Sequence, residues 1–322
     1  MIYRELGRTG WKVSAIGFGT WAIGSMWGPV DQRESIAALN RAVDLGVNFF
    51  DTADVYGSEP LLGQLRKQRK EPFLIATKMG MQVNPDPRQY TRRNLIMFVE
   101  NSLRHLGVET IDLMQLHCPP TEVYNAEVFG ILDDLTTQGK IRFYGVSVEK
   151  IEQAIKAIEF PGVQSVQIIF NIFRMRPILD LFPATKLHKV GIIARVPLAS
   201  GLLTGKMTQA TTFARDDHRA FNRYGNAFDR GETFSGVDFK IGLQAVEQLR
   251  EFVPEGMTMA QMALRWILMN DAVTCAIAGA KNPAQVEDNV RTADLAPLAD
   301  STMDRIAEIY DRNIRPQVHQ LW

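Results

Sequence analysis

The feature that most constrains the fold of this chain is a regular alternation of short apolar runs with longer helical patterns. Eight apolar runs lie at residues 16–19, 47–51, 73–77, 111–116, 143–147, 166–170, 191–196 and 274–278. Each run is brief and continuous, which is typical of parallel strands covered on both faces. Helical patterns lie between or after them, at residues 31–45, 60–67, 92–106, 125–138, 148–158, 177–189, 237–252 and 258–269, and Asn282-Pro283 begins another. This order predicts a (β/α)8 TIM barrel, with an open doubly wound sheet as the alternative.

Two further segments complete the expected architecture. Residues 3–6 and 12–15 flank the turn sequence Thr9-Gly10 and predict a β-hairpin before the first strand. Residues 205–236 are polar, with scattered aromatic side chains, so we expect a long loop insertion after the seventh strand. Such an insertion is either a functional lid or a variable surface loop. Because no linker composition divides the chain, we expect a single domain over residues 1–322.

Charge and cysteine content narrow the possible partners. The chain has 36 Lys and Arg residues and 36 Asp and Glu residues, so its formal net charge is zero. This balance argues against a nucleic-acid partner and against electrostatic membrane binding. Its two cysteines, Cys118 and Cys275, exclude a disulfide framework and a cysteine-based zinc spacing. The first residues are charged and lack the apolar run of a signal peptide, so we expect a cytoplasmic protein.

One glycine motif suggests a dinucleotide fold that the surrounding sequence does not support. Residues 17–22 read GFGTWA and match the loose GxGxxA fingerprint. In that motif a helix begins inside the glycine loop, so that its N-terminus faces the pyrophosphate. Here the next helical pattern begins near Asp31, and the bulky Trp21 stands where the backbone should approach phosphate. We therefore reject the open Rossmann sheet in favour of the barrel.

Four ionisable residues fall at the ends of three successive expected strands. Asp51, Lys78 and His117 end apolar strands, and Tyr56 follows Asp51 in the next loop. In a parallel barrel these ends meet on one face, where active sites are built. Burying a charge is costly unless the charge is paired. Each residue alone could cap a turn or pack, but their joint placement indicates an active site.

The segments around these residues resemble the aldo-keto reductase family. The resemblance covers DTADVYG at residues 51–57, TK at 77–78 and LHCP at 116–119, and continues through GKIR at 139–142, GVS at 145–147, PLASGLLTGK at 197–206 and GAK at 279–281. The resemblance extends over nearly the whole chain, and the motifs occur in the same order as in the family. Together these motifs are specific, whereas any single motif is weak evidence.

The resemblance implies an oxidoreductase that reduces aldehyde or ketone carbonyls with NADPH. Tyr56 would be the general acid, Lys78 would lower the pKa of that phenol, and Asp51 would position Lys78. His117 would orient the carbonyl oxygen. A proton donor and a hydride source suffice for this reaction, so we expect no metal.

The same comparison implies a set of cofactor-binding positions. Ser147 and Gln167 resemble the residues that hold the nicotinamide carboxamide, and Lys281 and Gln285 would meet the 2′-phosphate. The full expected set is Gly19, Thr20, Trp21, Ser147, Gln167, Arg195, Leu198, Ser200, Leu202, Lys206, Gly279, Lys281, Gln285 and Asn289. Three positions depart from the family: Val148 follows Ser147, Ala278 replaces a proline, and Arg195 replaces the tyrosine that stacks on the nicotinamide. We expect Arg195 to disfavour the positively charged oxidised ring.

The sequence constrains the substrate and the partners less than it constrains the catalytic and cofactor-binding residues. Trp21, Trp27, Tyr90 and Tyr124 lie in loops at the same barrel face, where they could form an apolar pocket or simply pack. We expect a small carbonyl substrate as partner, and the oligomeric state stays open. The alternative function is an accessory or regulatory subunit of an ion channel, because some relatives of this barrel serve in that way while retaining the cofactor site.

Overall fold

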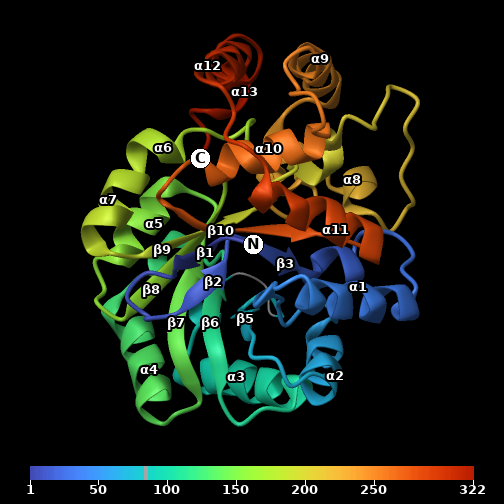
Figure 1. The fold of residues 1–322 in the computed structure, drawn as a ribbon. Helices are drawn as coiled ribbons and strands as arrows, with labels where there is room; N and C mark the ends of the chain where they lie inside the picture. Colours follow the sequence, from blue (N-terminus) through green and yellow to red (C-terminus); the bar gives the residue numbers. More distant parts are fainter. Residues whose placement is uncertain (83–85) are drawn as a thin grey trace.

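Eight parallel strands form a closed barrel in a computed structural model that describes residues 1–82 and 86–322 (Figure 1). In chain order the strands are β3 (Ile16–Gly19), β4 (Phe49–Asp51), β5 (Leu74–Met79), β6 (Ile111–His117), β7 (Ile141–Ser147), β8 (Val163–Ile169), β9 (Gly191–Arg195) and β10 (Val273–Gly279). Each strand pairs with its sequence neighbour, and β10 pairs with β3 to close the barrel. The (β/α)8 prediction is confirmed, and the open-sheet alternative is wrong.

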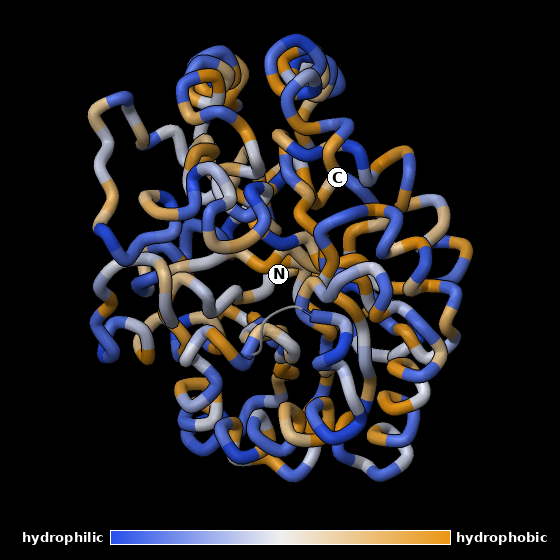
Figure 2. Tube along the Cα trace, turned by 180° about the vertical axis from the view of Figure 1, so that it is seen from behind, coloured by the Kyte–Doolittle hydropathy of each residue, from blue (hydrophilic) through white to orange (hydrophobic). Residues whose placement is uncertain are grey.

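Helices surround the barrel and cover the outer faces of the strands (Figure 1). They are α1 (Gln32–Asp44), α2 (Glu59–Gln68), α3 (Arg92–Leu106), α4 (Ala126–Thr137), α5 (Ile151–Ile158), α6 (Pro177–Asp180), α7 (Phe182–His188), α9 (Phe239–Arg250), α10 (Met259–Leu268), α11 (Pro283–Arg291), α12 (Asp300–Ile309) and α13 (Arg315–Val318). The pattern at 177–189 divides at Leu181 into two short helices, and the sequence patterns did not indicate α12 and α13. Hydrophilic and hydrophobic positions alternate along these outer helices (Figure 2), as expected for amphipathic helices on a core.

Side-chain caps fix where several helices begin. The carboxylate of Asp31 accepts hydrogen bonds from the backbone N–H groups of Arg33 and Glu34, which start α1. Thr91 caps α3 in the same way, and that helix ends at Gly107, whose φ of 64° suits a left-handed residue. These local signals are the reason that the predicted helix boundaries agree with the structure to within a few residues.

A β-hairpin covers the N-terminal end of the barrel. Strands β1 (Tyr3–Glu5) and β2 (Lys12–Ser14) pair antiparallel, as predicted. Leu6 and Val13 are fully buried in a cluster with barrel residues that include Phe49, Leu113 and Ile193. The hairpin therefore seals one end with apolar side chains and leaves the other end for a site.

The 205–236 insertion follows β9 and contains the short helix α8 (His218–Phe221) and the 3-10 turns Arg230–Glu232 and Phe234–Gly236. It lies beside the loop after β3, because the N–H of His218 donates to the carbonyl of Met26 over 2.8 Å. This packing places the insertion over the C-terminal ends of the strands. Across the described residues, every helix is too short or too polar to span a membrane.

Candidate active site

The structure brings the four predicted catalytic residues together at the C-terminal ends of β4, β5 and β6. The ammonium nitrogen of Lys78 lies 2.5 Å from an oxygen of Asp51 and 4.8 Å from the centre of the Tyr56 ring. The rings of Tyr56 and His117 meet edge to face with centres 5.7 Å apart. Strand closure therefore assembles this group from residues up to 66 positions apart, Asp51 and His117.

The Lys78–Asp51 ion pair is buried and well supplied with hydrogen bonds. Lys78 also donates to the carbonyl of Thr52 over 2.8 Å. The second oxygen of Asp51 accepts from Gln167 over 2.7 Å and from Gln115 over 3.4 Å. A buried pair is tolerated when further hydrogen bonds satisfy both charges, and here they do. Gln167, which we expected at the nicotinamide carboxamide, thus also holds Asp51 in place, and its side chain still lines the cavity.

Protonation states follow from burial in this group. Burial, together with the positive charges of Lys78 and Arg195, holds the pKa of His117 well below its usual value, so its ring is neutral. Among the described residues, Nδ1 of His117 has no hydrogen-bond partner. Burial and the Asp51 carboxylate raise the pKa of Tyr56 well above its usual value. Desolvation and the Asp51 carboxylate dominate this shift, so the expected lowering of the phenol pKa by Lys78 stays a prediction.

A cavity of about 480 Å³ opens beside Tyr56 and reaches α11. Eleven of the predicted cofactor residues line it: Gly19, Trp21, Gln167, Arg195, Leu198, Ser200, Lys206, Gly279, Lys281, Gln285 and Asn289. The cavity is therefore built from the ends of β3, β4, β6, β8, β9 and β10 together with α11.

Three predicted cofactor residues lie outside the cavity wall. Thr20 is fully buried and donates to the carbonyl of Asp51. Ser147 is also buried, and its hydroxyl lies 3.6 Å from the sulfur of Cys118. Leu202 is buried in the core. Neighbouring elements cover these three side chains, and direct cofactor contact at these positions stays a prediction.

Of the four expected substrate residues, two line the cavity and two lie in the core. Trp21 and Trp27 line the cavity, and the Trp21 ring stacks on Tyr56 with centres 5.8 Å apart. Tyr90 and Tyr124 are 5% and 0% exposed and belong to the core, so the structure does not bring them to the cavity wall with the two tryptophans. In both, burial raises the pKa of the phenol.

Sequence reasoning missed the residues that the 205–236 insertion brings to this site. Arg219 and Glu232, both in the 205–236 insertion, line the cavity. The ring of His218 packs 4.7 Å from Trp21 and 4.5 Å from Trp27. The aromatic and charged content of the insertion was the available signal, but nothing local indicated where the segment would dock.

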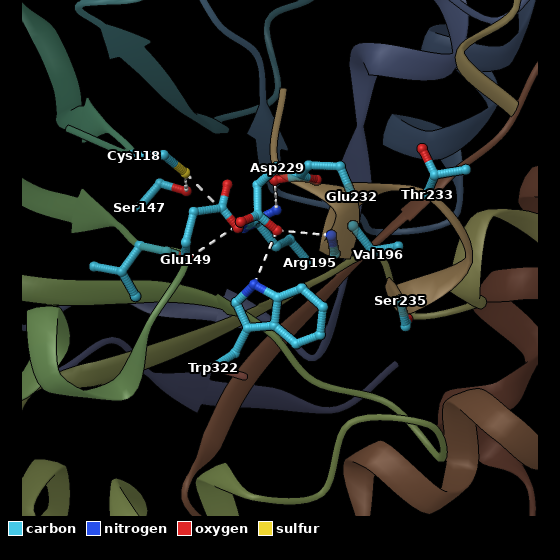
Figure 3. A network of polar contacts seen from close by, with 12 residues as sticks. Cys118, Ser147, Glu149, Arg195, Val196, Asp229, Glu232, Thr233, Ser235 and Trp322 are labelled. Carbon is cyan, nitrogen blue, oxygen red and sulfur yellow. Dashed lines mark hydrogen bonds and ion pairs between the residues drawn. The ribbon is translucent and has the colours of Figure 1, made fainter. Parts of the chain in front are cut away.

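Arg195 lies at the centre of a polar network beside the catalytic group (Figure 3). Its guanidinium donates to the Val148 carbonyl over 2.8 Å, to Glu149 over 3.2 Å, and to Glu232. Cys118, Glu149 and Glu232 bring potential metal-ligand atoms within 4.8 Å of one another. The cation of Arg195 already contacts all three, the sulfur at 3.6 Å, so this cluster is an ion-pair network.

The far end of the cavity suits a phosphorylated dinucleotide. Burial and the positive charge of Arg219 lower the pKa of Lys281, and a bound anion would offset both effects. Lys206 adds a third cation to the wall. A Cβ at Gly279 would lie 3.1 Å from that of Ala22, so glycine keeps this wall open for a close approach. The residues present therefore fit a nicotinamide dinucleotide of the NAD(P)H class.

Comparisons with known proteins agree with this geometry. Aldo-keto reductase YhdN of Bacillus subtilis is 34% identical over 297 residues, which cover 89% of this chain and 87% of that protein. A probable voltage-gated potassium channel subunit beta of Arabidopsis thaliana is 28% identical over 96% of each chain. The solved structure of glycerol dehydrogenase AKR11B4 from Gluconobacter oxydans is 31% identical, covers 97% of this chain and 96% of that one, and superposes with a TM-score of 0.79.

The family model named Aldo/keto reductase family matches residues 15–311, which include every strand of the barrel and the four converging residues. The resemblance seen in the sequence is therefore confirmed over nearly the whole chain. With the same barrel in a solved relative, this match establishes that the chain belongs to the aldo/keto reductase family of oxidoreductases.

Proposed function

We propose that this protein reduces aldehyde or ketone carbonyls to alcohols with NADPH, and that Tyr56 is the general acid. One observation carries this proposal: a protonated phenol, stacked on Trp21 and beside a buried Lys–Asp pair, faces a cavity whose far end gathers cations. A carbonyl reductase needs a proton donor and a site for a phosphorylated hydride donor within reach of each other.

The catalytic group would act through proton transfer and charge stabilisation. When bound, NADPH supplies the hydride. As charge develops on the carbonyl oxygen, Tyr56 donates its proton, and the ammonium of Lys78 stabilises the resulting phenolate. Asp51, held by Gln167 and Gln115, keeps Lys78 in position. A raised pKa does not prevent this donation, because the alkoxide that forms is a stronger base than a phenolate.

His117 would serve as a neutral partner for the carbonyl oxygen. Its depressed pKa keeps the ring uncharged at physiological pH, and one ring nitrogen has no partner among the described residues. A neutral imidazole can orient the carbonyl by a hydrogen bond without competing as an acid with Tyr56.

The remaining wall would hold the cofactor and the substrate. Lys281 and Gln285 would bind the 2′-phosphate, with Asn289 at the adenine. Lys206, Leu198 and Ser200 line the same cavity and would follow the pyrophosphate. Trp21 and Trp27 would cover a small carbonyl substrate with apolar surface.

Replacement of Tyr56 by Phe tests the proposal. Tyr56→Phe removes the proton but keeps the ring that stacks on Trp21, so kcat should fall by about 10²–10⁴-fold. The affinity for NADPH, measured by fluorescence titration, should stay within a few-fold. Tyr90→Phe is the matched control, because Tyr90 lies in the core outside the cavity, and it should retain near wild-type turnover. Near wild-type aldehyde reduction by Tyr56→Phe would show that Tyr56 is not the acid.

The accessory-subunit alternative is not favoured by the comparisons. The Arabidopsis relative named as a channel subunit and the Bacillus subtilis aldo-keto reductase both match most of this chain, so the match does not separate the two roles. Multi-turnover oxidation of NADPH with simple aldehydes supports the enzyme, whereas a single turnover with tight retention of the nucleotide would support the accessory role. Parallel assays with NADH test the choice of cofactor.

A further inference from the structure

The Arg195 network contains more negative than positive groups in a small buried volume. Arg195, at the end of β9, is 7% exposed and lies between Glu149, which precedes α5, and Glu232 of the insertion (Figure 3). One guanidinium therefore faces two carboxyl groups. If both are ionised, the three side chains carry a single negative charge. If they share one proton, the charge is zero.

Proton sharing follows from the surroundings of Glu149. Burial and the negative charge of Glu232 raise the pKa of Glu149 to about 8, although Arg195 opposes this rise. Asp229 of the insertion acts in the same direction as Glu232. Near neutral pH Glu149 therefore carries a proton beside Glu232, and Glu149 loses that proton as the pH rises through about 8.

The other titratable groups around Glu149 do not supply or remove a proton near neutral pH. Arg174 follows β8, and its pKa, lowered by burial to about 10, keeps it charged near neutral pH. Burial raises the pKa of Cys118, so its thiol stays neutral beside the network. Arg176 and His319 line a small cavity with Glu149, and burial lowers the pKa of His319, which favours its neutral form. Glu149 is thus the group in this network with a pKa near the working pH.

The network lies where the reactive ring of the cofactor has to bind. Arg195 and Glu232 line the cavity together with Tyr56 and His117. Under the proposed function, on which this inference depends, hydride and proton reach the same carbonyl group. The nicotinamide ring must therefore lie within a substrate's width of Tyr56, beside the network. Reduced nicotinamide is neutral, whereas oxidised nicotinamide carries a positive charge.

We propose that Arg195, Glu149 and Glu232 form a charge clamp that sets the relative affinity of this enzyme for NADP⁺ and NADPH. The neutral, protonated clamp does not distinguish the two rings by charge. The negative, deprotonated clamp attracts the oxidised ring. Binding of NADP⁺ therefore expels the shared proton, and binding of NADPH does not. The expectation that Arg195 alone repels NADP⁺ is replaced by a balance that the two carboxyl groups control.

The test measures binding of the two nucleotides, separately from turnover. Dissociation constants of NADP⁺ and NADPH are determined for the full chain between about pH 6.5 and pH 9.5. The ratio of NADP⁺ affinity to NADPH affinity should increase with pH, by at most about tenfold per pH unit for one linked proton. Calorimetry in buffers of different ionisation enthalpy should detect more proton release with NADP⁺ than with NADPH. Both nucleotides carry the 2′-phosphate, so its titration cancels in the difference.

Matched variants test whether the clamp causes the pH dependence of the affinity ratio. Glu149→Gln should flatten the pH dependence of the affinity ratio and abolish the difference in proton release. Glu232→Gln serves the same purpose from the insertion if Glu149→Gln does not fold. Glu159→Gln, an exposed position at the end of α5, should behave as wild type. A ratio that stays constant with pH in the wild type, while both nucleotides bind, overturns the clamp alone. Failure of both nucleotides to bind overturns the proposed function as well.

Discussion

At the scale of single residues, the buried Lys78–Asp51 pair governs both stability and chemistry. Each partner has further hydrogen bonds: Lys78 to Thr52, and Asp51 to Gln167 and Gln115. Such a pair contributes little net stability while intact, but removal of one partner leaves an uncompensated buried charge. The arrangement is therefore suited to holding an ammonium beside Tyr56 in a fixed position.

Asp51→Ala should lower the free energy of unfolding by about 3–5 kcal/mol, because Lys78 then remains charged and unpaired in the core. Adding Lys78→Met to this variant should restore part of the lost stability without restoring activity. Urea unfolding and aldehyde reduction measure the two effects. A double variant no more stable than Asp51→Ala would mean that the unpaired ammonium is not the cause of the loss.

At the scale of elements, the site depends on how the 205–236 insertion docks on the loop after β3. The His218 ring packs against both Trp21 and Trp27, and His218 contacts the Met26 carbonyl through both its backbone N–H and its ring. Burial lowers the pKa of His218 to about 4. The docked insertion therefore requires a neutral imidazole.

Acid should loosen the docked insertion. The unfolded or undocked histidine binds a proton below its usual pKa of about 6.5, whereas the docked ring resists protonation until about pH 4. Docking stability is thus full above pH 6.5 and is lost as the pH falls toward 4. Amide protection factors in residues 205–236, which correct for the slower intrinsic exchange in acid, should therefore fall over this interval.

His218→Phe keeps an aromatic ring against the two tryptophans but removes the titration. In this variant, the protection factors of the insertion should no longer fall with acid. An equal loss of protection in the wild type and His218→Phe would assign the effect to other groups.

At the scale of the whole molecule, stability and function occupy opposite ends of the barrel. The hairpin seals the N-terminal end through the apolar cluster around Leu6, whereas the cavity lies at the C-terminal strand ends. This separation is general for such barrels, because loops at one face can vary while the other face supports the fold.

Leu6→Ala should therefore reduce the free energy of unfolding by about 2–5 kcal/mol, as expected for truncation of a fully buried leucine. NADPH affinity and turnover should stay close to wild type at temperatures where the variant is folded. Chemical denaturation and nucleotide titration of the same preparation measure both. A large loss of affinity in the folded variant would show that the hairpin end and the cavity are coupled.

Sequence patterns predicted most of the fold and part of the site. All eight barrel strands lie at or near the expected ranges, because buried parallel strands leave a continuous apolar signal. The helices after residue 300 were missed, since α12 buries little more than Ile306 and Ile309 and so has a weak apolar pattern. The four converging residues were predictable, because a charged side chain at the end of an apolar strand is costly to bury unless a partner or a site compensates it.

The sequence by itself determined the order of strands and helices, the hairpin and the residue types at the strand ends, because these depend on neighbours along the chain. The tertiary structure alone decided that Tyr124 is core, that Gln167 holds Asp51, and that Glu149 and Glu232 surround Arg195. Those contacts join elements distant in the sequence. Their distances, and with them the burial that moves each pKa, exist only once the barrel has closed and the insertion has docked.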